Sequence, residues 1–307
     1  MSNRMRVFAV VVNWNGGEDN LACVRSLLDQ GLAQAQVVFV DNASRDGSTE
    51  AVEAAFPGLT VLRNARNLGY GHGNNRGIEA ALEAGAEAVF LANNDLVLPA
   101  GALAALEAAL EARPEVGIVG PRVLYRDEPS MVWAAGGWLT FRHNLTTLRG
   151  HREPDGPEWQ TSLDVDFVPG AAMLVRRAVF ERAGLLDGEY FAYHEDADFC
   201  LAASEAGFGV ACIGAVSALH RTHAATGGGY NPRRKYMLGV NTVWFLRRHG
   251  TPVRWLRFVL FDVLSLLPLL LLEACRGRAR AVLAKARGMY DGLRGRRVTA
   301  ETVERGA

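Results

Sequence analysis

The chain has 307 residues, 49% of them hydrophobic and 21% charged, and its 33 basic side chains balance 33 acidic ones. This composition excludes a disordered or fibrous chain and fits a globular protein with one large core or two. Four cysteines without CxxC spacing are too few for a disulfide framework, so we expect buried thiols in a reducing compartment. The opening "MSNRMRVFAVVVNWN" lacks a signal-peptide cleavage pattern, which predicts a cytosolic protein, and we expect no nucleic-acid partner.

The first 112 residues alternate short apolar runs with helical patterns. The predicted strands are "VFAVVV", "VVFV", "TVLR" and "AVFLA", and the predicted helices are "LACVRSLLDQ", "STEAVEAAF", "GNNRGIEAALEAG" and "PAGALAALEAALEA". This alternation predicts a mostly parallel sheet with helices on both faces. Sheets of this kind bind ligands at the carboxyl ends of their strands.

Polar residues follow three of these strands directly. They are Asn13 and Asn15 after the first strand, Asp41 and Asn42 after the second, and Asn93, Asn94 and Asp95 after the fourth. Asn and Asp are also ordinary turn and cap residues, so each cluster taken alone is better explained as a turn. Three clusters on the same edge of the sheet favour a binding site.

The glycine-rich stretch "GYGHGNNRG", residues 69–77, does not fit a dinucleotide-binding fingerprint. Asn74 and Arg76 stand where a third glycine is required, and the stretch follows the third strand instead of the first. A glycine-rich turn at a helix start can still bring backbone N–H groups close to a phosphate. A simple tight turn is the alternative, and the residues leave both open.

Asp95, in "ANND", is a candidate ligand for a hard divalent cation whose other ligands are water and a diphosphate. Capping of the following helix is the alternative. His220 ends a later apolar run and is either a further ligand or a structural histidine. His223, three residues on, suggests a zinc pair, which the lack of other Cys or His at ligand spacing disfavours.

The stretch "FAYHEDADFC" places carboxylates among aromatic and small apolar residues. Helical periodicity from about Asp196 to Ala206 puts Glu195 and Asp196 at a helix N-terminus, where the helix dipole favours ionised carboxylates. Such a carboxylate can act as a general base if it faces a reacting hydroxyl. Plain N-capping is the alternative, but it does not explain the preceding aromatic residues.

The C-terminal part changes character twice. From about residue 113, shorter apolar runs with Trp and Gly predict added antiparallel strands at the sheet edge. The apolar span Phe258–Leu272 has 15 residues and contains Asp262 and Pro268, whereas crossing a bilayer takes about 20. An arginine-rich tail follows, so a buried core helix and a helix lying in the membrane interface both fit, and the basic tail favours the second.

Taken together, these motifs resemble the family 2 glycosyltransferases of GT-A fold, in particular the bacterial rhamnosyltransferase-like branch. The motifs that carry the resemblance are "VVNWNG", "VDNASRDGS", "NLGYGHGNNRGI", "ANND", "GAAMLVRR", "FAYHEDADFCLAA" and "LHRTHAATGGGYNPRRKYMLGVNTVWFLRRHG". They cover about residues 5–250 in the right order. The implied fold is α/β, a Rossmann-like mostly parallel mixed sheet flanked by helices, with a C-terminal helical extension.

The resemblance implies a role for each matching residue. Asp95 would bind Mg²⁺ or Mn²⁺ with His220 as a possible second ligand, Asp196 would be the general base, and Glu195 and His194 would line the acceptor side. The donor nucleotide sugar would be bound by Asn13, Asp41, Asn42, Asn67, Gly69, Asn75 and Asn94. The first position of the family's DxD-type metal motif is Asn93 here, which leaves metal binding to Asp95 and the phosphates.

The implied protein is an inverting glycosyltransferase acting on a glycan or lipid-linked acceptor, with dTDP-rhamnose or a UDP-sugar as the favoured donor. Residues 1–250 would form the catalytic domain, with a nucleotide-sugar half (1–112) and an acceptor half (113–250). Residues 251–307 would form a basic amphipathic helical region that attaches peripherally to the cytoplasmic face of the membrane.

Two other functions are compatible with this kind of sheet. A sugar-nucleotide nucleotidyltransferase should carry a basic glycine-rich loop after the first strand, and "NWNGGEDN" has no basic residue. A non-catalytic sugar-binding or scaffold protein is the other alternative, and the presence of both Asp95 and Asp196 argues against it.

Overall fold

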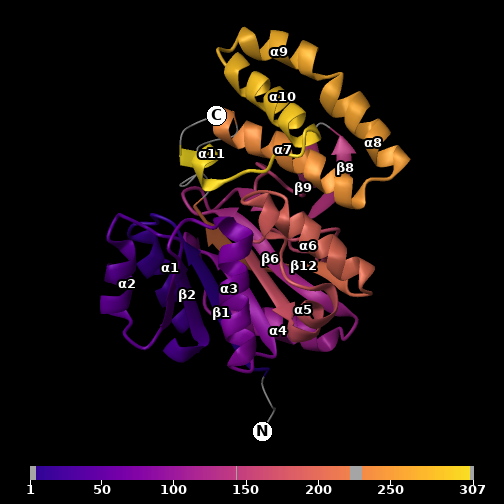
Figure 1. The fold of residues 1–307 in the computed structure, drawn as a ribbon. Coiled ribbons are helices and arrows are strands. Elements are labelled where there is room, and N and C mark those ends of the chain that lie inside the picture. The colour runs from indigo at the N-terminus through magenta and orange to yellow at the C-terminus, as the bar shows by residue number, and fades with distance from the viewer. Residues whose placement is uncertain (1–4, 143, 222–229, 305–307) are drawn as a thin grey trace.

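The computed structural model describes residues 5–142, 144–221 and 230–304, and it contains a mixed sheet covered by helices (Figure 1). The strands are β1 (Val7–Asn13), β2 (Val37–Asp41), β3 (Thr60–Arg63), β4 (Ala88–Asn93), β5 (Leu96–Val97), β6 (Val116–Tyr125), β7 (Val132–Ala134), β8 (Gly137–Arg142), β9 (Asn144–Leu148), β10 (Leu163–Asp164), β11 (Ala172–Arg176) and β12 (Gly209–His220). The helices are α1 (Asp19–Leu28), α2 (Ser48–Ala55), α3 (Gly69–Glu83), α4 (Ala102–Ala112), α5 (Arg177–Ala183), α6 (Glu195–Glu205), α7 (Pro232–His249), α8 (Pro252–Phe258), α9 (Leu266–Ala274), α10 (Ala279–Leu293) and α11 (Ala300–Glu304). A π-helical turn, η4 (Val259–Val263), follows α8, and the 3₁₀ turns are η1 (Gln34–Gln36), η2 (Pro157–Trp159) and η3 (Gly188–Tyr190).

The main sheet has the strand order β10-β12-β6-β11-β4-β1-β2-β3, with β5 paired to β12 and β7 to β6. The four strands predicted from the first 112 residues pair in parallel in the order β3-β2-β1-β4. β11 runs antiparallel between β4 and β6, and β12 runs parallel to β6. The later strands therefore extend the sheet beyond β4, and the predicted α/β architecture is confirmed.

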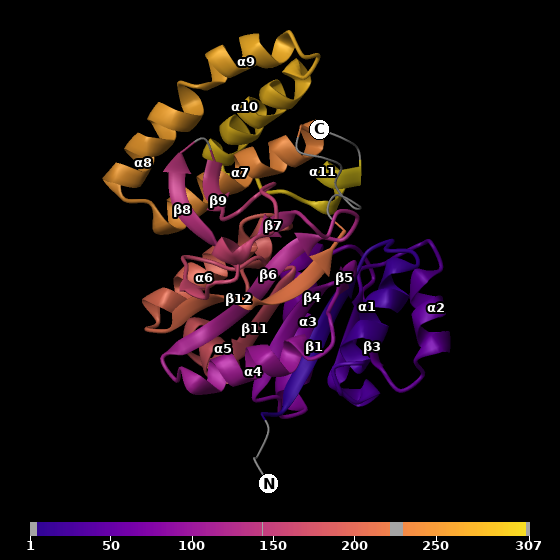
Figure 2. The same ribbon diagram turned by 180° about the vertical axis from the view of Figure 1, so that it is seen from behind.

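The central strands are apolar up to their last residue because both faces of the sheet are covered (Figure 2). Successive side chains of a strand point to opposite faces. Phe8 and Val10 join one core with residues of α3, α5 and α6, whereas Ala9 and Val11 join a second core with residues of α1 and α4. A strand buried on both sides needs no polar alternation, which is why "VFAVVV" reads as one apolar run.

The carboxyl ends of the central strands bring the predicted polar clusters together. Asn13 at the end of β1 pairs in register with Asp41 at the end of β2. On the other side of β1, Val12 pairs with Asn93 at the end of β4. The three clusters therefore lie on adjacent strands at one edge of the sheet, as their positions in the sequence predicted.

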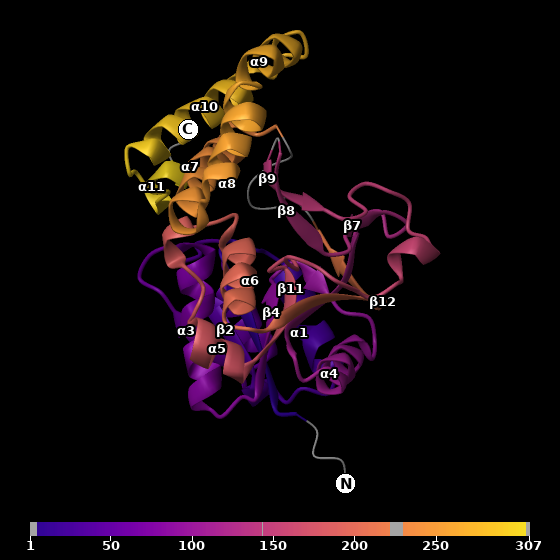
Figure 3. The ribbon, with the colours of Figure 1, turned by 90° about the vertical axis from the view of Figure 1, so that its right-hand side faces the viewer.

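The C-terminal helices form a group beyond this edge of the sheet (Figure 3). α10 packs along α7 and also against α9. α7 lies before the predicted domain boundary at residue 250, and α10, on which it packs, lies after that boundary. The division into residues 1–250 and 251–307 stays a prediction. Cys23, Cys200 and Cys212 are buried as predicted, but Cys275 is exposed because it follows a helix that leaves much of its surface uncovered.

Candidate active site

Asn13 links the loops that follow three strands. Its side chain is fully buried, and its Oδ1 accepts hydrogen bonds from Nδ2 of Asn20 at 3.0 Å and of Asn94 at 3.1 Å. Its Nδ2 donates to the hydroxyl oxygens of Ser48 at 2.9 Å and Ser44 at 3.1 Å. Both ends of the amide are thus engaged inside the protein, so Asn13 holds the strand-end loops in place around the predicted donor site.

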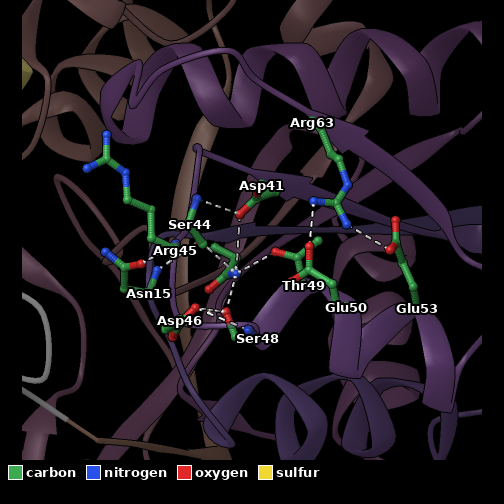
Figure 4. A network of polar contacts seen from close by, with 11 residues as sticks. Asn15, Asp41, Ser44, Arg45, Asp46, Ser48, Thr49, Glu50, Glu53 and Arg63 are labelled. Atoms are coloured by element: carbon green, nitrogen blue, oxygen red, sulfur yellow. Dashed lines mark hydrogen bonds and ion pairs between the residues drawn. The ribbon is translucent and has the colours of Figure 1, made fainter.

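Asp41 belongs to the network drawn in Figure 4, where its Oδ1 lies 3.5 Å from the Asn13 Nδ2. Its carboxylate is buried, and Oδ1 accepts from the backbone N–H of Ser44 at 3.2 Å. The loop after β1 is tied to this loop by Asn15, whose N–H donates to the Ser44 hydroxyl at 2.9 Å and whose side-chain oxygen accepts from the Arg45 N–H at 2.8 Å. Hydrogen bonds therefore tie the loop after β1 to the loop after β2 next to Asp41.

The glycine-rich turn is joined to the end of β2. Asn42 donates from Nδ2 to the Gly69 carbonyl at 3.0 Å, and Asn67 accepts from the Gly69 N–H at 2.9 Å. Gly69 has φ +81°, and a Cβ there would lie 2.5 Å from the carbonyl oxygen of Phe191, so both conformation and space require glycine. Asn75 points elsewhere: its amide donates to and accepts from the backbone of Leu186, at 2.7 and 3.0 Å.

Asp95 and His220 meet at the ends of β4 and β12. The Asp95 Oδ1 lies 3.0 Å from the His220 Nε2, and the Asn93 Nδ2 lies 3.1 Å from the same nitrogen. His220 reaches this position because it pairs with Leu96 across the β5–β12 ladder. The Trp133 ring packs edge-on against the imidazole at 4.8 Å between centroids. The two residues predicted as metal ligands are thus in contact, whereas His223 lies outside the described residues.

The donor set fits a cation that takes most of its ligands from a substrate. One carboxylate and one imidazole, both nearly buried, offer an oxygen and a nitrogen at one point. Among the residues that the structure describes, no group of three or more His, Cys, Asp or Glu side chains is placed to hold a metal. A closed protein cage is therefore absent from that part of the chain, and phosphate oxygens would have to complete the coordination.

Asp196 lies in the first turn of α6, as predicted. Its Oδ2 accepts from the Gly170 N–H at 3.1 Å and its Oδ1 from the Ala197 N–H at 2.8 Å. Burial raises the pKa of Asp196 above its ordinary value, although both of these hydrogen bonds act to lower it. The sequence suggested that the helix terminus would favour the ionised form, but desolvation outweighs that effect here.

Glu195 is more deeply buried than its neighbour. Its side chain is 7% exposed, and Oε2 has no hydrogen-bond partner among the described residues. Burial, followed by the charge of Asp196, raises the pKa of Glu195 well above its usual range. Two adjacent carboxyl groups that both favour the protonated form are typical of sites that handle protons.

The loop before α6 has an unusual backbone. Phe191, Tyr193 and His194 have φ of 61°, 74° and 77°, a region that residues other than glycine seldom adopt. Asn241, fully buried in α7, donates from Nδ2 to the carbonyls of Tyr190, Ala192 and Tyr193 at 2.9, 2.7 and 2.9 Å. Its side chain therefore holds the strained loop in place.

Neither Asn241 nor the role of Asp198 was predicted. The sequence did contain a signal for Asn241, because it is a polar residue within the apolar face of a helix, in "MLGVNTVW". Asp198 accepts at Oδ1 from the Tyr190 hydroxyl and the His249 Nε2, both at 2.8 Å, and from the Arg248 Nε at 3.1 Å. It is a buried anchor between α6 and the end of α7.

His194 occupies the N-cap position of α6, and its side chain is buried without a capping hydrogen bond. It is 6% exposed, and its Nε2 lies 3.3 Å from the Thr242 hydroxyl. Burial, followed by the positive charges of Lys285 and Arg234, lowers the pKa of His194 to about 3. The imidazole is therefore neutral at physiological pH and can exchange hydrogen bonds without adding charge beside Asp196.

A short backbone segment connects the two predicted centres. The Ala171 carbonyl accepts from the Asn93 N–H at 3.0 Å, while the N–H of the preceding residue, Gly170, donates to Asp196. The Tyr70 hydroxyl donates to the Gly170 carbonyl at 2.6 Å. The loop of Asp95, the glycine-rich turn and the start of α6 therefore surround one region at the carboxyl edge of the sheet.

Comparison with known proteins identifies the class. The family model described as "Glycosyltransferase like family 2" matches residues 5–234. The chain is 29% identical over 211 residues to the N-acetylglucosaminyl-diphospho-decaprenol L-rhamnosyltransferase of Mycobacterium tuberculosis, which covers 62% of this chain and 68% of that protein. It is 27% identical over 214 residues to the low-salt glycan biosynthesis hexosyltransferase Agl10 of Haloferax volcanii, covering 69% and 66%.

A solved structure supports the fold. The mannosyltransferase PcManGT from Pyrobaculum calidifontis, in complex with GDP-Man and Mn²⁺, superposes with a TM-score of 0.60 at 19% identity, over 95% of this chain and 88% of that one. The chain therefore belongs to glycosyltransferase family 2 and is a glycosyltransferase of GT-A fold. The resemblance seen in the sequence is confirmed, and the nucleotidyltransferase alternative loses its support.

Proposed function

We propose that the protein is an inverting glycosyltransferase that moves a sugar from a nucleotide diphosphate donor to a hydroxyl group of a glycan or lipid-linked acceptor. The observation that carries this proposal is that the segment of Gly170 and Ala171 links the end of β4, two residues before Asp95, to Asp196: the Ala171 carbonyl accepts from the Asn93 N–H, and the Gly170 N–H donates to Asp196. In this proposal Asp95 would neutralise the diphosphate through a bound cation, and Asp196 would take the proton of the acceptor hydroxyl.

In this proposal the acceptor oxygen forms the new glycosidic bond while the bond from the anomeric carbon to the diphosphate oxygen breaks. The hydroxyl proton passes to Asp196, which the N–H groups of Gly170 and Ala197 hold in position. Attack from the side opposite the leaving group inverts the anomeric centre. Mg²⁺ or Mn²⁺ held by Asp95, with His220 beside it, would supply charge neutralisation to the departing diphosphate.

The donor is the finer part of the proposal. dTDP-rhamnose is favoured and UDP-sugars come next, in keeping with the rhamnosyltransferase among the relatives. Asp41, Asn42, Asn67, Gly69 and Asn94 would bind the nucleotide sugar, and Asn13 and Asn75 would support the loops that do so. A thermal-shift screen of nucleotide sugars with Mn²⁺ tests the ranking, because a ligand that binds the folded state raises the melting temperature. A clear preference for a guanosine-linked sugar would overturn it.

The base is tested by the change Asp196→Asn. Transfer should be lost because the amide cannot accept the proton, while donor binding should change little because the diphosphate is held elsewhere. Isothermal titration with nucleotide and metal, run beside an activity assay, measures both. Retained turnover would refute the assignment, and a protein that binds donor without transferring or hydrolysing it at all would instead fit the sugar-binding alternative.

Peripheral attachment to the cytoplasmic face of the membrane is the second part of the proposal. The helical run Pro252–Ala274 has 23 residues, and its most apolar 18-residue window has mean hydropathy 2.0, so length and composition alone would allow it to cross a membrane. This run is longer than the 15 apolar residues counted in the sequence, because the helix continues through Arg254 and Arg257. Only 11% of its most apolar window is buried, which argues against a core helix.

The exposed side chains of this run form an apolar stripe. Its members, spaced three or four residues apart along the helix, are Leu256, Leu260, Leu264, Leu267 and Leu271. They are between 47% and 66% exposed. The polar side of the run faces inward, where Asp262 pairs with Lys285 of α10 at 2.5 Å. A helix with one face bound to the protein and the other apolar and exposed fits a position in the membrane interface.

A further inference from the structure

A pocket lies between the C-terminal helices and the hairpin of β8 and β9. Its volume is about 200 Å³, which leaves room for several water molecules. It is bounded by β9, the start of α7, the start of α9 and the middle of α10. Its polar and aromatic lining residues are Asn144, Tyr230, Lys235, Asp262, Ser265 and Lys285. None of these residues belongs to the candidate active site.

The pocket carries an excess of positive charge. Lys285 and Asp262 offset one another, since their side chains are both buried and 2.5 Å apart. Lys235 is half-buried, and its ammonium lies 4.9 Å from the centre of the Tyr230 ring. Burial, followed by the charges of Lys285 and Arg234, lowers the pKa of Lys235 to about 8. An anion in the pocket would relieve this repulsion and restore the full charge of the ammonium.

The pocket is polar on the side where an anion would be held. The Asn144 amide adds a neutral donor to the two ammonium groups, whereas the Ser265 hydroxyl donates to the Phe261 carbonyl at 2.6 Å and lines the pocket without a free proton. Arg278 also packs over the Tyr230 ring, with 5.1 Å between the guanidinium carbon and the ring centre. Cations with neutral donors are the usual composition of phosphate sites.

The position of the pocket relates it to two other features. On one side, Ser265 and Leu266 of its wall adjoin Leu264 and Leu267 of the apolar stripe. On the other, Arg234 precedes Lys235 and packs its guanidinium over the Tyr193 ring at 5.3 Å. Tyr193 belongs to the strained loop that leads into His194, Glu195 and Asp196. The pocket therefore lies between the proposed membrane-facing surface and the loop that positions the base.

We propose that this pocket binds the phosphate or diphosphate group of a lipid-linked acceptor. The lipid chain would lie along the apolar stripe of α8 and α9, and the sugar of the acceptor would extend past Tyr193 toward Asp196. This inference rests on the proposed function, because it concerns the acceptor of that reaction. It adds a site between the helical extension and the part of the chain before residue 250, and this site selects acceptors that carry both an anion and a lipid chain.

Direct binding of farnesyl diphosphate to the full-length protein tests the inference. EDTA is present throughout, so that metal-dependent binding of diphosphate near Asp95 is suppressed. The wild type should bind farnesyl diphosphate at least ten-fold more tightly than farnesol or inorganic diphosphate. Lys235→Met should weaken binding at least ten-fold, and Lys235→Arg should stay within about three-fold. Equal binding by the wild type and Lys235→Met would overturn the proposal.

Two control arms distinguish this pocket from the donor site and from a general affinity for lipid headgroups. Asp95→Ala should bind the probe like the wild type, and a matching loss in this variant would mean that the probe occupies the donor site instead. Phosphatidylglycerol vesicles should bind Lys235→Met as well as the wild type, and an equal loss there would mean that the pocket takes ordinary headgroups, which also overturns the proposal. Equal melting temperatures of the Lys235 variants establish that they are folded.

The proposed function is tested separately by donor hydrolysis with the wild type. Hydrolysis of a nucleotide sugar without binding of farnesyl diphosphate would refute only the pocket inference. If the protein hydrolyses no nucleotide sugar, the proposed function is refuted. The two failures are thus told apart on the same preparation.

Discussion

Asn241 should be the most sensitive position outside the reacting groups themselves. Replacing it with alanine removes the donor that holds the carbonyls of Tyr190, Ala192 and Tyr193. The Tyr190 carbonyl also accepts from the Ala192 N–H at 2.7 Å, so two carbonyls bear most of the loss. A buried carbonyl left without a donor costs about 1–3 kcal/mol, so the loss at two carbonyls should lower the free energy of unfolding by roughly 2–6 kcal/mol.

The same change should affect catalysis more than donor binding. The loop held by Asn241 keeps Phe191, Tyr193 and His194 at positive φ, a conformation that costs roughly 1–3 kcal/mol for each residue. Without the donor, the loop would relax and move the start of α6, and a shift of about 1 Å can lower a rate by about 100-fold. We therefore expect kcat to fall at least ten-fold, with a donor KM close to that of the wild type.

Two measurements and two further variants check this reasoning. The melting temperature should drop by roughly 3–9 °C, and kcat is measured well below the transition so that the protein is folded. Asn241→Asp should be worse than Asn241→Ala, because a carboxylate of the same shape would face three carbonyls. Thr242→Val is the matched control, since it loses only the 3.3 Å contact with His194. A kcat of Asn241→Ala within two-fold of the wild type would refute the role of the loop.

The remaining predictions concern metal, pH and membrane. Asp95→Ala should weaken nucleotide binding in Mn²⁺ and leave it unchanged in EDTA; titrations in which neither the substitution nor EDTA matters would remove the metal role. Burial favours the protonated form of Asp196, so kcat/KM should rise with pH through a pKa above that of an ordinary aspartate, and a profile flat from about pH 4 to 8 would contradict a base at that position. The double change Leu264→Ser and Leu267→Ser should lower flotation with anionic liposomes at least ten-fold, because burying each leucine contributes about 1.5–3 kcal/mol. Leu283→Ser on α10 is the control and should leave flotation unchanged. Equal flotation of the wild type, the double variant and the control would exclude the stripe as the membrane contact.

The sequence by itself determined the class of protein and the edge of the sheet at which the candidate site lies. Strands buried on both faces have no polar residues until they end, so the positions of Asn13, Asp41 and Asn93 along the chain are enough to mark the carboxyl edge of the sheet. The start of α6 could also be predicted, because the helical periodicity begins at the carboxylates Glu195 and Asp196. These signals are local, and each is carried by residues within one turn or one strand.

Tertiary structure alone decided how those residues are held and what environment they have. Asn241 lies 45 residues beyond Asp196 in the sequence, and no local pattern relates it to the loop whose carbonyls it binds. The raised pKa of Asp196 and the internal hydrogen bonds of Asn13 depend on burial and on partners from other elements. The sequence left a buried and an interfacial helix open after residue 250, because an apolar run looks the same in both. In the structure, the pairing of Asp262 with Lys285 turns the polar side of this helix inward and leaves its leucines exposed.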